Sequence, residues 1–221
     1  PSESAATWGV DDGYGYNTGV VSADGVKEIH TYIPYYTCAV WSATVNKNYS
    51  IADNLEALAN AYIYTGDMRY GRLGAIMLDR IADIYPAMDV SLYENYYTSD
   101  GGTGLGKILG RIWDVNLAKT FALAYDAFFP IYDDPQVVEY LHEKAEMFNL
   151  DNEKTTPEQI RANAENGILR EIYDAVKTGK INGNFGMHQS AVTAAAVVLD
   201  TQPYTNEMID WVFKNGVGGT K

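Results

Sequence analysis

The spacing of apolar side chains changes from irregular to helical at about residue 50. Between residues 51 and 62 apolar positions recur at helical spacing, and the sequence TGD at 65–67 interrupts them. A second periodic stretch runs from residue 68 to residue 85, where Pro86 stops it. Because a tight glycine turn joins two stretches of similar length, we predict an antiparallel helical hairpin. The candidates for the inward side of its second helix are Leu73, Ile76, Met77, Arg80, Ile81 and Ile84.

Five more helices are predicted after residue 104. Asp134 and Thr156 each precede a proline, and a side-chain cap followed by proline is typical of a helix start. No stretch has the pattern of a convincing strand. The predicted ranges are 105–129, 135–148, 157–177, 187–199 and 206–214.

The fold class predicted from this order is all-α. Short connections make neighbouring helices antiparallel, and hairpins placed side by side form a solenoid or an incomplete (α/α) toroid with one concave face. Loops at one rim of such a ring would collect the functional side chains.

Residues 1–49 lack a helical period and are rich in aromatic side chains, so we predict an irregular N-terminal segment. The whole chain has 18 tyrosines and 4 tryptophans. Aromatic rings with a free polar end suit sugar stacking, although core packing is the alternative for each of them. The aromatic candidates for substrate contact are Tyr35, Tyr36, Trp41 and Tyr97.

Composition narrows the possible partners. The 221 residues include 47% hydrophobic side chains, enough for one domain with a substantial core. The net charge of -13 and the absence of a basic cluster argue against a nucleic-acid partner. The single cysteine, Cys38, excludes an internal disulfide, and the three separated histidines have no spacing typical of a metal site. No apolar run is long enough to predict a membrane span.

Candidate chemistry concentrates in the segment INGNFGMHQ at 181–189, which leads into a helix of small apolar residues. In the first turn of that helix, His188 and Gln189 would lie beside free backbone N–H groups at the positive end of the helix dipole. This arrangement suits an anion such as a carboxylate. Asn184 has the simpler alternative of forming a left-handed turn between glycines.

Five motifs together resemble the heparinase II/III-like polysaccharide lyases: IPYY (33–36), ANAYIYTGD (59–67), DRIADIYP (79–86), GRIW (110–113) and GNFGMHQ (183–189). The similarity extends from about residue 8 to residue 200. Members of that family combine an incomplete (α/α) toroid with β-sandwich domains and cleave uronic-acid-containing polysaccharides by β-elimination. The resemblance therefore implies one toroid domain over residues 1–221, an acidic polysaccharide partner, and a secreted or periplasmic location.

The resemblance also assigns roles to residues. Asn184 and His188 match the positions that neutralise the uronate carboxylate, which stabilises the charge that develops when the neighbouring proton leaves. His188 is alternatively the base, because an imidazole titrates near neutral pH. Arg111 is a substrate clamp or an ion-paired core residue. The substrate-binding candidates besides the aromatic four are Asn182, Gln189, Arg111 and Trp113.

One family feature is missing from this chain. The catalytic tyrosine of the family lies well beyond the Asn/His loop, whereas the last tyrosine here, Tyr204, is too close to it. The chain also begins PSES, without a methionine or a signal peptide. We therefore expect a fragment without the β-sandwich domain, inactive as it stands. We predict no cofactor and leave open a structural metal in such a C-terminal domain.

Two other functions remain open at this point. An (α/α) toroid glycoside hydrolase would use two carboxylates, for which Asp114 and Glu165 are candidates. A glycan-binding module without activity would need only the aromatic surface. For a lyase, the scarcity of cations favours a polymer with little sulfate, such as alginate, hyaluronate or a plant or algal uronan.

Overall fold

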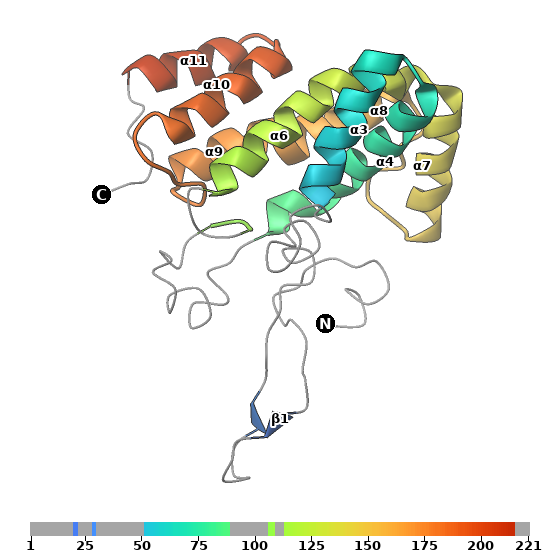
Figure 1. Ribbon diagram of the computed structural model, residues 1–221, viewed down its shortest axis with the longest axis horizontal. Coiled ribbons are helices and arrows are strands. Elements are labelled where there is room, and N and C mark those ends of the chain that lie inside the picture. Colours follow the sequence, from blue (N-terminus) through green and yellow to red (C-terminus); the bar gives the residue numbers. More distant parts are fainter. Residues whose placement is uncertain (1–19, 22–27, 30–50, 89–105, 109–112, 215–221) are drawn as a thin grey trace.

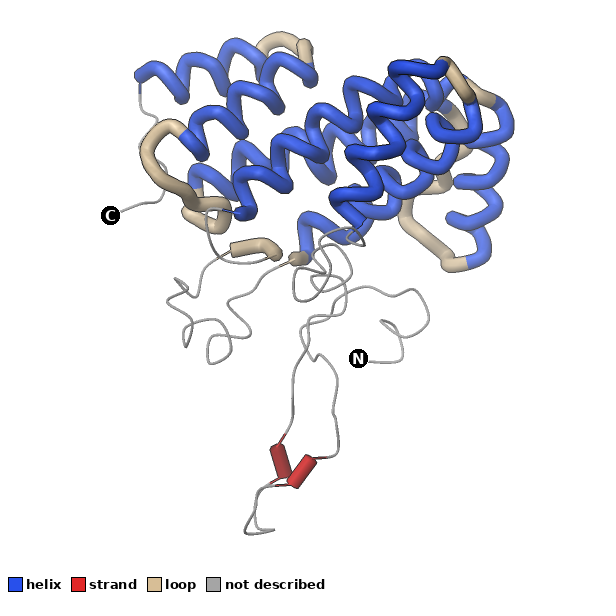
Figure 2. The backbone as a smooth tube through the Cα atoms, in the orientation of Figure 1, coloured by secondary structure: helices blue, strands red, loops and turns tan. Residues whose placement is uncertain are grey.

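The computed structural model describes residues 20–21, 28–29, 51–88, 106–108 and 113–214, and these are mostly helical (Figures 1 and 2). The predicted all-α class is thereby confirmed. The only strands in this part of the chain are β1 (Val20–Val21) and β2 (Glu28–Ile29), which pair antiparallel. The α-helices are α3 (Ile51–Thr65), α4 (Met68–Ile84), α6 (Trp113–Phe128), α7 (Pro135–Met147), α8 (Pro157–Ala164), α9 (Glu171–Lys177), α10 (Met187–Leu199) and α11 (Tyr204–Lys214). Shorter helical segments are η1 (Tyr85–Ala87), η3 (Phe129–Asp133) and the π-helix η4 (Glu165–Arg170).

The predicted hairpin is formed by α3 and α4. Gly66 turns the chain with a left-handed φ of +66°, and its N–H donates to the carbonyl of Tyr62 at 2.8 Å. Asp67 then caps α4 by accepting the N–H of Arg69 at 2.9 Å. The glycine and the aspartate of the TGD sequence therefore end one helix and start the next, as the sequence predicts.

The inward face of α4 differs from the prediction at Leu73, which is 56% exposed. Ile81 and Ile84 are buried as predicted, and toward the start of α4 the buried positions are Gly71 and Gly74, because bulky side chains of neighbouring segments fill the space beside them. A Cβ at Gly74 would lie 2.0 Å from the ring of Phe128, and one at Gly71 would lie 2.7 Å from Ile131. At these two glycines the backbone of α4 therefore lies directly against large side chains of α6 and η3.

Helix α6 lies at the centre of the packing. It contacts α3 and α4 on one side and α10 on the other, and α10 in turn carries α11 (Figure 1). Its buried aromatic residues include Phe121, Tyr125 and Phe128. One face of α10, which includes Ala195 and Ala196, is fully buried as predicted, whereas Val197 on another face is 64% exposed.

The start of α6 is wrong in the sequence prediction, which began this helix at residue 105. Residues 106–108 are not helical, and the described helix begins at Trp113. The buried Asp114 accepts the backbone N–H groups of Lys107 at 3.0 Å and Ile108 at 3.3 Å. The carboxylate therefore folds the preceding segment back onto the first turn of the helix.

The predicted helix 157–177 is continuous but has a π-helical segment in its middle, which the sequence does not predict. The segment η4 widens the turn between α8 and α9. On either side of it the helix has different neighbours, since α8 packs against α4 and α9 packs against α10. At Gly167, a Cβ would lie 2.3 Å from the carbonyl oxygen of Ala82.

This contact gives a first prediction. Gly167→Ala is expected to lower the free energy of unfolding by about 2 kcal/mol, because the added methyl group meets the backbone of α4 and overpacks the interface. Urea unfolding monitored by circular dichroism measures the change. Asn166→Ala, at an exposed position in the same π-helix, is the control and is expected to stay within about 0.5 kcal/mol. Equal stability of the two variants would contradict the close packing described here.

Candidate functional site

The loop before α10 begins this helix as predicted. Gly186 occupies the N-cap with a left-handed φ of +91°, a conformation that favours glycine. Its N–H donates to Oε1 of Gln189 at 2.7 Å, so the glutamine side chain closes the loop onto the first turn. Gln189 is therefore mostly occupied with the local backbone and is only 9% exposed. Asn182, earlier in the loop, is half-buried.

His188 does not lie at the rim where the sequence led us to expect it. Its side chain is buried, with 3% of the residue exposed, in a helix that packs against α6, α9 and η4. Nδ1 lies 3.3 Å from the carbonyl oxygen of Gly183. Nε2 is also buried and has no hydrogen-bond partner within the described part of the chain. When Nδ1 carries the proton, it donates to Gly183 and leaves Nε2 as an unused acceptor.

Asn184 is exposed, and so is its neighbour Phe185, which is 91% exposed. Asn184 is not left-handed, because the positive φ of this loop belongs to Gly186. Its backbone carbonyl accepts the N–H of Met187 at 2.9 Å, so Asn184 occupies the first position of a turn, where asparagine is common. The exposed side chain forms no hydrogen bond with the described residues, so its amide can still bind a ligand.

The loop lies against the first turn of α6. A Cβ at Gly183 would be 2.9 Å from the side chain of Val115, and Trp113, two residues before Val115, is 44% exposed. The structure thus places the segment around Asn184 against the helix that begins with the predicted residue Trp113. The candidates Arg111, Tyr35, Tyr36, Trp41 and Tyr97 lie outside the described residues.

The two carboxylates of the hydrolase alternative do not face each other across an opening. Asp114 is 1% exposed, and its two oxygens hold the backbone of residues 107 and 108. Glu165 accepts the hydroxyl of Tyr125 at 2.9 Å. Burial and this carboxylate raise the pKa of Tyr125. Both acids are engaged in holding the helices.

Sequence reasoning missed a buried ionic cluster, which we name the Lys154 cluster: Lys154, Asp79, Asp83 and Asn163. Lys154 lies in the loop between α7 and α8 and is 1% exposed. Its Nζ contacts Asp79 at 2.5 Å and Asp83 at 2.7 Å. The Asn163 amide donates to the same two carboxylates at 2.9 and 2.8 Å. The cluster therefore ties the loop and α8 to α4.

A second buried lysine joins three other segments. Lys107 is fully buried, and its Nζ donates to Glu171 at the start of α9 and to the carbonyl of Pro86 at 3.3 Å. The same ammonium lies 4.9 Å from the ring centre of Tyr85. These contacts join residues 106–108 to η1 and α9.

The Lys154 cluster predicts a pH dependence. Burial and the neighbouring Asp83 raise the pKa of Asp79 to about 6 from 3.8. Between these values the folded protein binds a proton that the unfolded chain does not, so the contribution of Asp79 to stability falls as the pH rises from about 4 to about 6. Over this pH range the free energy of unfolding of the native chain should fall by roughly 1–3 kcal/mol relative to that of Asp79→Asn. Urea unfolding of both proteins at several pH values measures it, and parallel curves would contradict the assignment.

Metal and membrane signals are absent from what the structure describes. Among the described residues, no three His, Cys, Asp or Glu side chains are grouped so that they could hold a metal ion. None of the described helices combines the length and apolar character that crossing a bilayer requires.

Comparisons of the chain with protein-family models, with curated proteins and with solved structures find no match.

Proposed function

We propose that this chain is the helical toroid portion of a polysaccharide lyase and that Asn184 binds the carboxylate of a uronic-acid residue. The single observation that carries this proposal is the exposed amide of Asn184, which lies on a loop beside the first turn of α6. An amide donor suits a carboxylate, and Trp113, which begins α6 and is 44% exposed, offers an aromatic surface for a sugar ring. The hairpin α3–α4, the central α6 and the pair α10–α11 would form consecutive parts of the ring.

The local charge supports an anionic ligand in spite of the acidic chain. No aspartate or glutamate occurs between Asp174 and Asp200, whereas Lys177 and Lys180 lie in this stretch. Lys177 is exposed and Lys180 is partly exposed. This stretch of the sequence therefore has a positive net charge, which favours the binding of a carboxylate although the whole chain is acidic.

The burial of His188 changes its proposed role. We assign it as a positioning residue: Nδ1–H donates to the carbonyl of Gly183 and so fixes the residue that precedes Asn184. Asn184 then makes the direct contact and stabilises the charge that develops on the sugar carboxylate as the neighbouring proton leaves. The base is a separate group. The family resemblance assigns it to a tyrosine after this loop, and no tyrosine follows Tyr204 in this sequence.

The test of the proposed function separates binding from elimination. The chain is run through gels that contain alginate or hyaluronate, and through gels that contain the same polymers with their carboxyl groups reduced to alcohols. We expect retardation by the acidic polymers and not by the reduced ones. Equal mobility in all gels would contradict the proposal.

Elimination is measured with the full natural gene product on the same polymers. The expected result is the ultraviolet absorbance of an unsaturated sugar. Release of reducing ends without this absorbance would show a hydrolase instead. Retardation without any product would show a glycan-binding module.

A further inference from the structure

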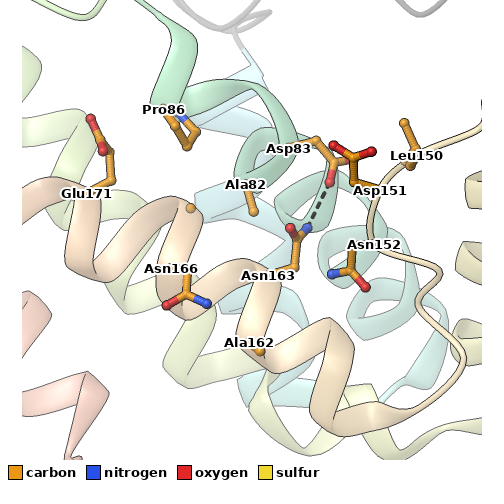
Figure 3. Close-up of a pocket in the computed structure, with 11 residues that line it drawn as sticks. Ala82, Asp83, Pro86, Leu150, Asp151, Asn152, Ala162, Asn163, Asn166 and Glu171 are labelled. Carbon is orange, nitrogen blue, oxygen red and sulfur yellow. Dashed lines mark hydrogen bonds between the residues drawn. The ribbon is translucent and has the colours of Figure 1, made fainter.

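We infer that a second site binds a sugar without negative charge, either neutral or amino-bearing. This site is a polar pocket between α4, the loop before α8, α8 with η4, and the start of α9. The pocket has a volume of about 480 Å³, which is within the range of small-molecule sites. Its polar lining residues are Asp83, Asp151, Asn152, Asn163, Asn166 and Glu171 (Figure 3). The pocket is distinct from the Asn184 loop, none of whose residues line it.

The charges of this pocket are arranged in two layers. Three carboxylates and three amides line it, and none of the lining residues is a lysine or an arginine. The cations lie behind the wall: Lys154 contacts Asp83, and Lys107 contacts Glu171, and both lysines are at most 1% exposed. A ligand therefore meets acceptor oxygens first, while the buried ammonium groups keep the wall stable.

Two lining groups are free to bind a ligand. The side chains of Asp151 and Asn166 are exposed and form no hydrogen bond or ion pair within the described structure. Figure 3 places Asp151 beside Asp83 on one side of the pocket and Asn166 on the side of Glu171. The pocket thus presents a free acceptor and a free amide from different elements.

The π-helix shapes this pocket. Asn166 and Gly167 of η4 both line it, and Gly167 lets the π-helical backbone approach Ala82 of α4, another lining residue. Widened turns of this kind are frequent at functional sites. Here the π-helix contributes Asn166, whose exposed side chain lines the pocket.

These features define the ligand chemistry. Carboxylates and amides accept the hydroxyl hydrogens of a sugar, and the amides also donate to its oxygens. An anionic sugar would meet three carboxylates with no cation at the surface of the pocket, so it is rejected. A metal ion is not the ligand we propose, since no group of metal-binding side chains is found among the described residues. The selectivity is opposite to that proposed for Asn184.

Ligand-observed NMR of the chain with cellobiose, with the disaccharide of glucosamine, and with glucuronic acid tests the inference. We expect binding of either or both of the first two and none of glucuronic acid. Asn166→Ala should weaken the binding about fivefold, the loss of one hydrogen bond. Ala162→Phe fills the pocket from an exposed position and should abolish binding. Asp151→Asn should weaken the amino sugar more than cellobiose.

The control is Asp126→Asn, which removes an exposed carboxylate from α6, outside the pocket, and should leave binding unchanged. Circular dichroism confirms that each variant folds. Binding of glucuronic acid as tight as that of cellobiose, no binding of any sugar, or unchanged binding in both Asn166→Ala and Ala162→Phe would overturn the inference. Asn184→Ala should not change sugar binding by the pocket, and Ala162→Phe should not change the retardation by alginate. The experiments can therefore contradict either proposal without contradicting the other.

Discussion

Lys154→Met is expected to lower the free energy of unfolding by about 3–5 kcal/mol at neutral pH. The lysine is buried and its ammonium contacts two carboxylates, Asp79 and Asp83. Removing one member of a buried ionic group leaves uncompensated charge in a medium that solvates it poorly. Methionine keeps most of the volume of the side chain, so the loss of stability results from the removed charge rather than from a cavity. Urea unfolding measures the change.

Two comparisons make the expectation for Lys154 specific. Lys214→Met removes an exposed lysine that pairs with Asp210 within α11, and it should cost no more than about 0.5 kcal/mol. The cost of Lys154→Met should also shrink as the pH falls toward 4, because protonation of Asp79, whose pKa is raised to about 6, removes the repulsion between the two aspartates. A cost that is small at neutral pH, or that does not change with pH, would contradict the ionic role of the cluster.

Asn184→Ala should reduce the elimination rate of the full natural gene product by about 10²–10³-fold on alginate or hyaluronate, if the proposed function holds. This is the usual effect of removing one hydrogen-bond donor from a site that stabilises developing negative charge. The ultraviolet absorbance of the unsaturated product gives the rate. In residues 1–221 alone, the same substitution should remove most of the retardation by the acidic polymers.

A merely structural role of Asn184 predicts a different pattern. Asn184→Asp has nearly the same shape and would preserve a turn, but its charge repels a carboxylate, so it should be at least as damaging as Asn184→Ala. Asn206→Ala, at an exposed asparagine of α11, is the control and should keep the full rate. A fast Asn184→Asp variant would refute the carboxylate contact.

The helices were predictable because their signals are local. Thr156 and Asp134 cap the helices that the sequence assigns to them, and the glycine turn at Gly66 separates the hairpin helices as expected. The errors arise where distant residues compete with the local pattern. Leu73 fits the period of α4, yet Phe128 and Ile131 occupy the space on its inner face. The start of α6 depends on Asp114 binding the backbone of a preceding segment.

The candidate site was predictable only in part, for the same reason. Asn184 was predicted from the composition of segment 181–189 and from its resemblance to the lyase motif. The exposure of its side chain agrees with a binding role. The burial of His188 depends on the packing of α6 and α9, which spacing along α10 cannot reveal. The burial of Lys154 could not be predicted from the sequence, because its carboxylate partners are 71 and 75 positions earlier in the chain.

The π-helix between α8 and α9 determines which changes of length this continuous helix tolerates. In an ordinary helix each residue advances the side chains by about 100° around the axis, and a π-turn accommodates one residue more than an α-turn does. The wider turn absorbs this extra residue, so deleting one residue from η4 would restore a uniform helix and leave α8 facing α4 and α9 facing α10. Deleting one residue from α8 would remove no surplus, and it would rotate the residues on either side of the deletion by about 100° relative to each other. A one-residue deletion should therefore be tolerated better in η4 than elsewhere in this helix.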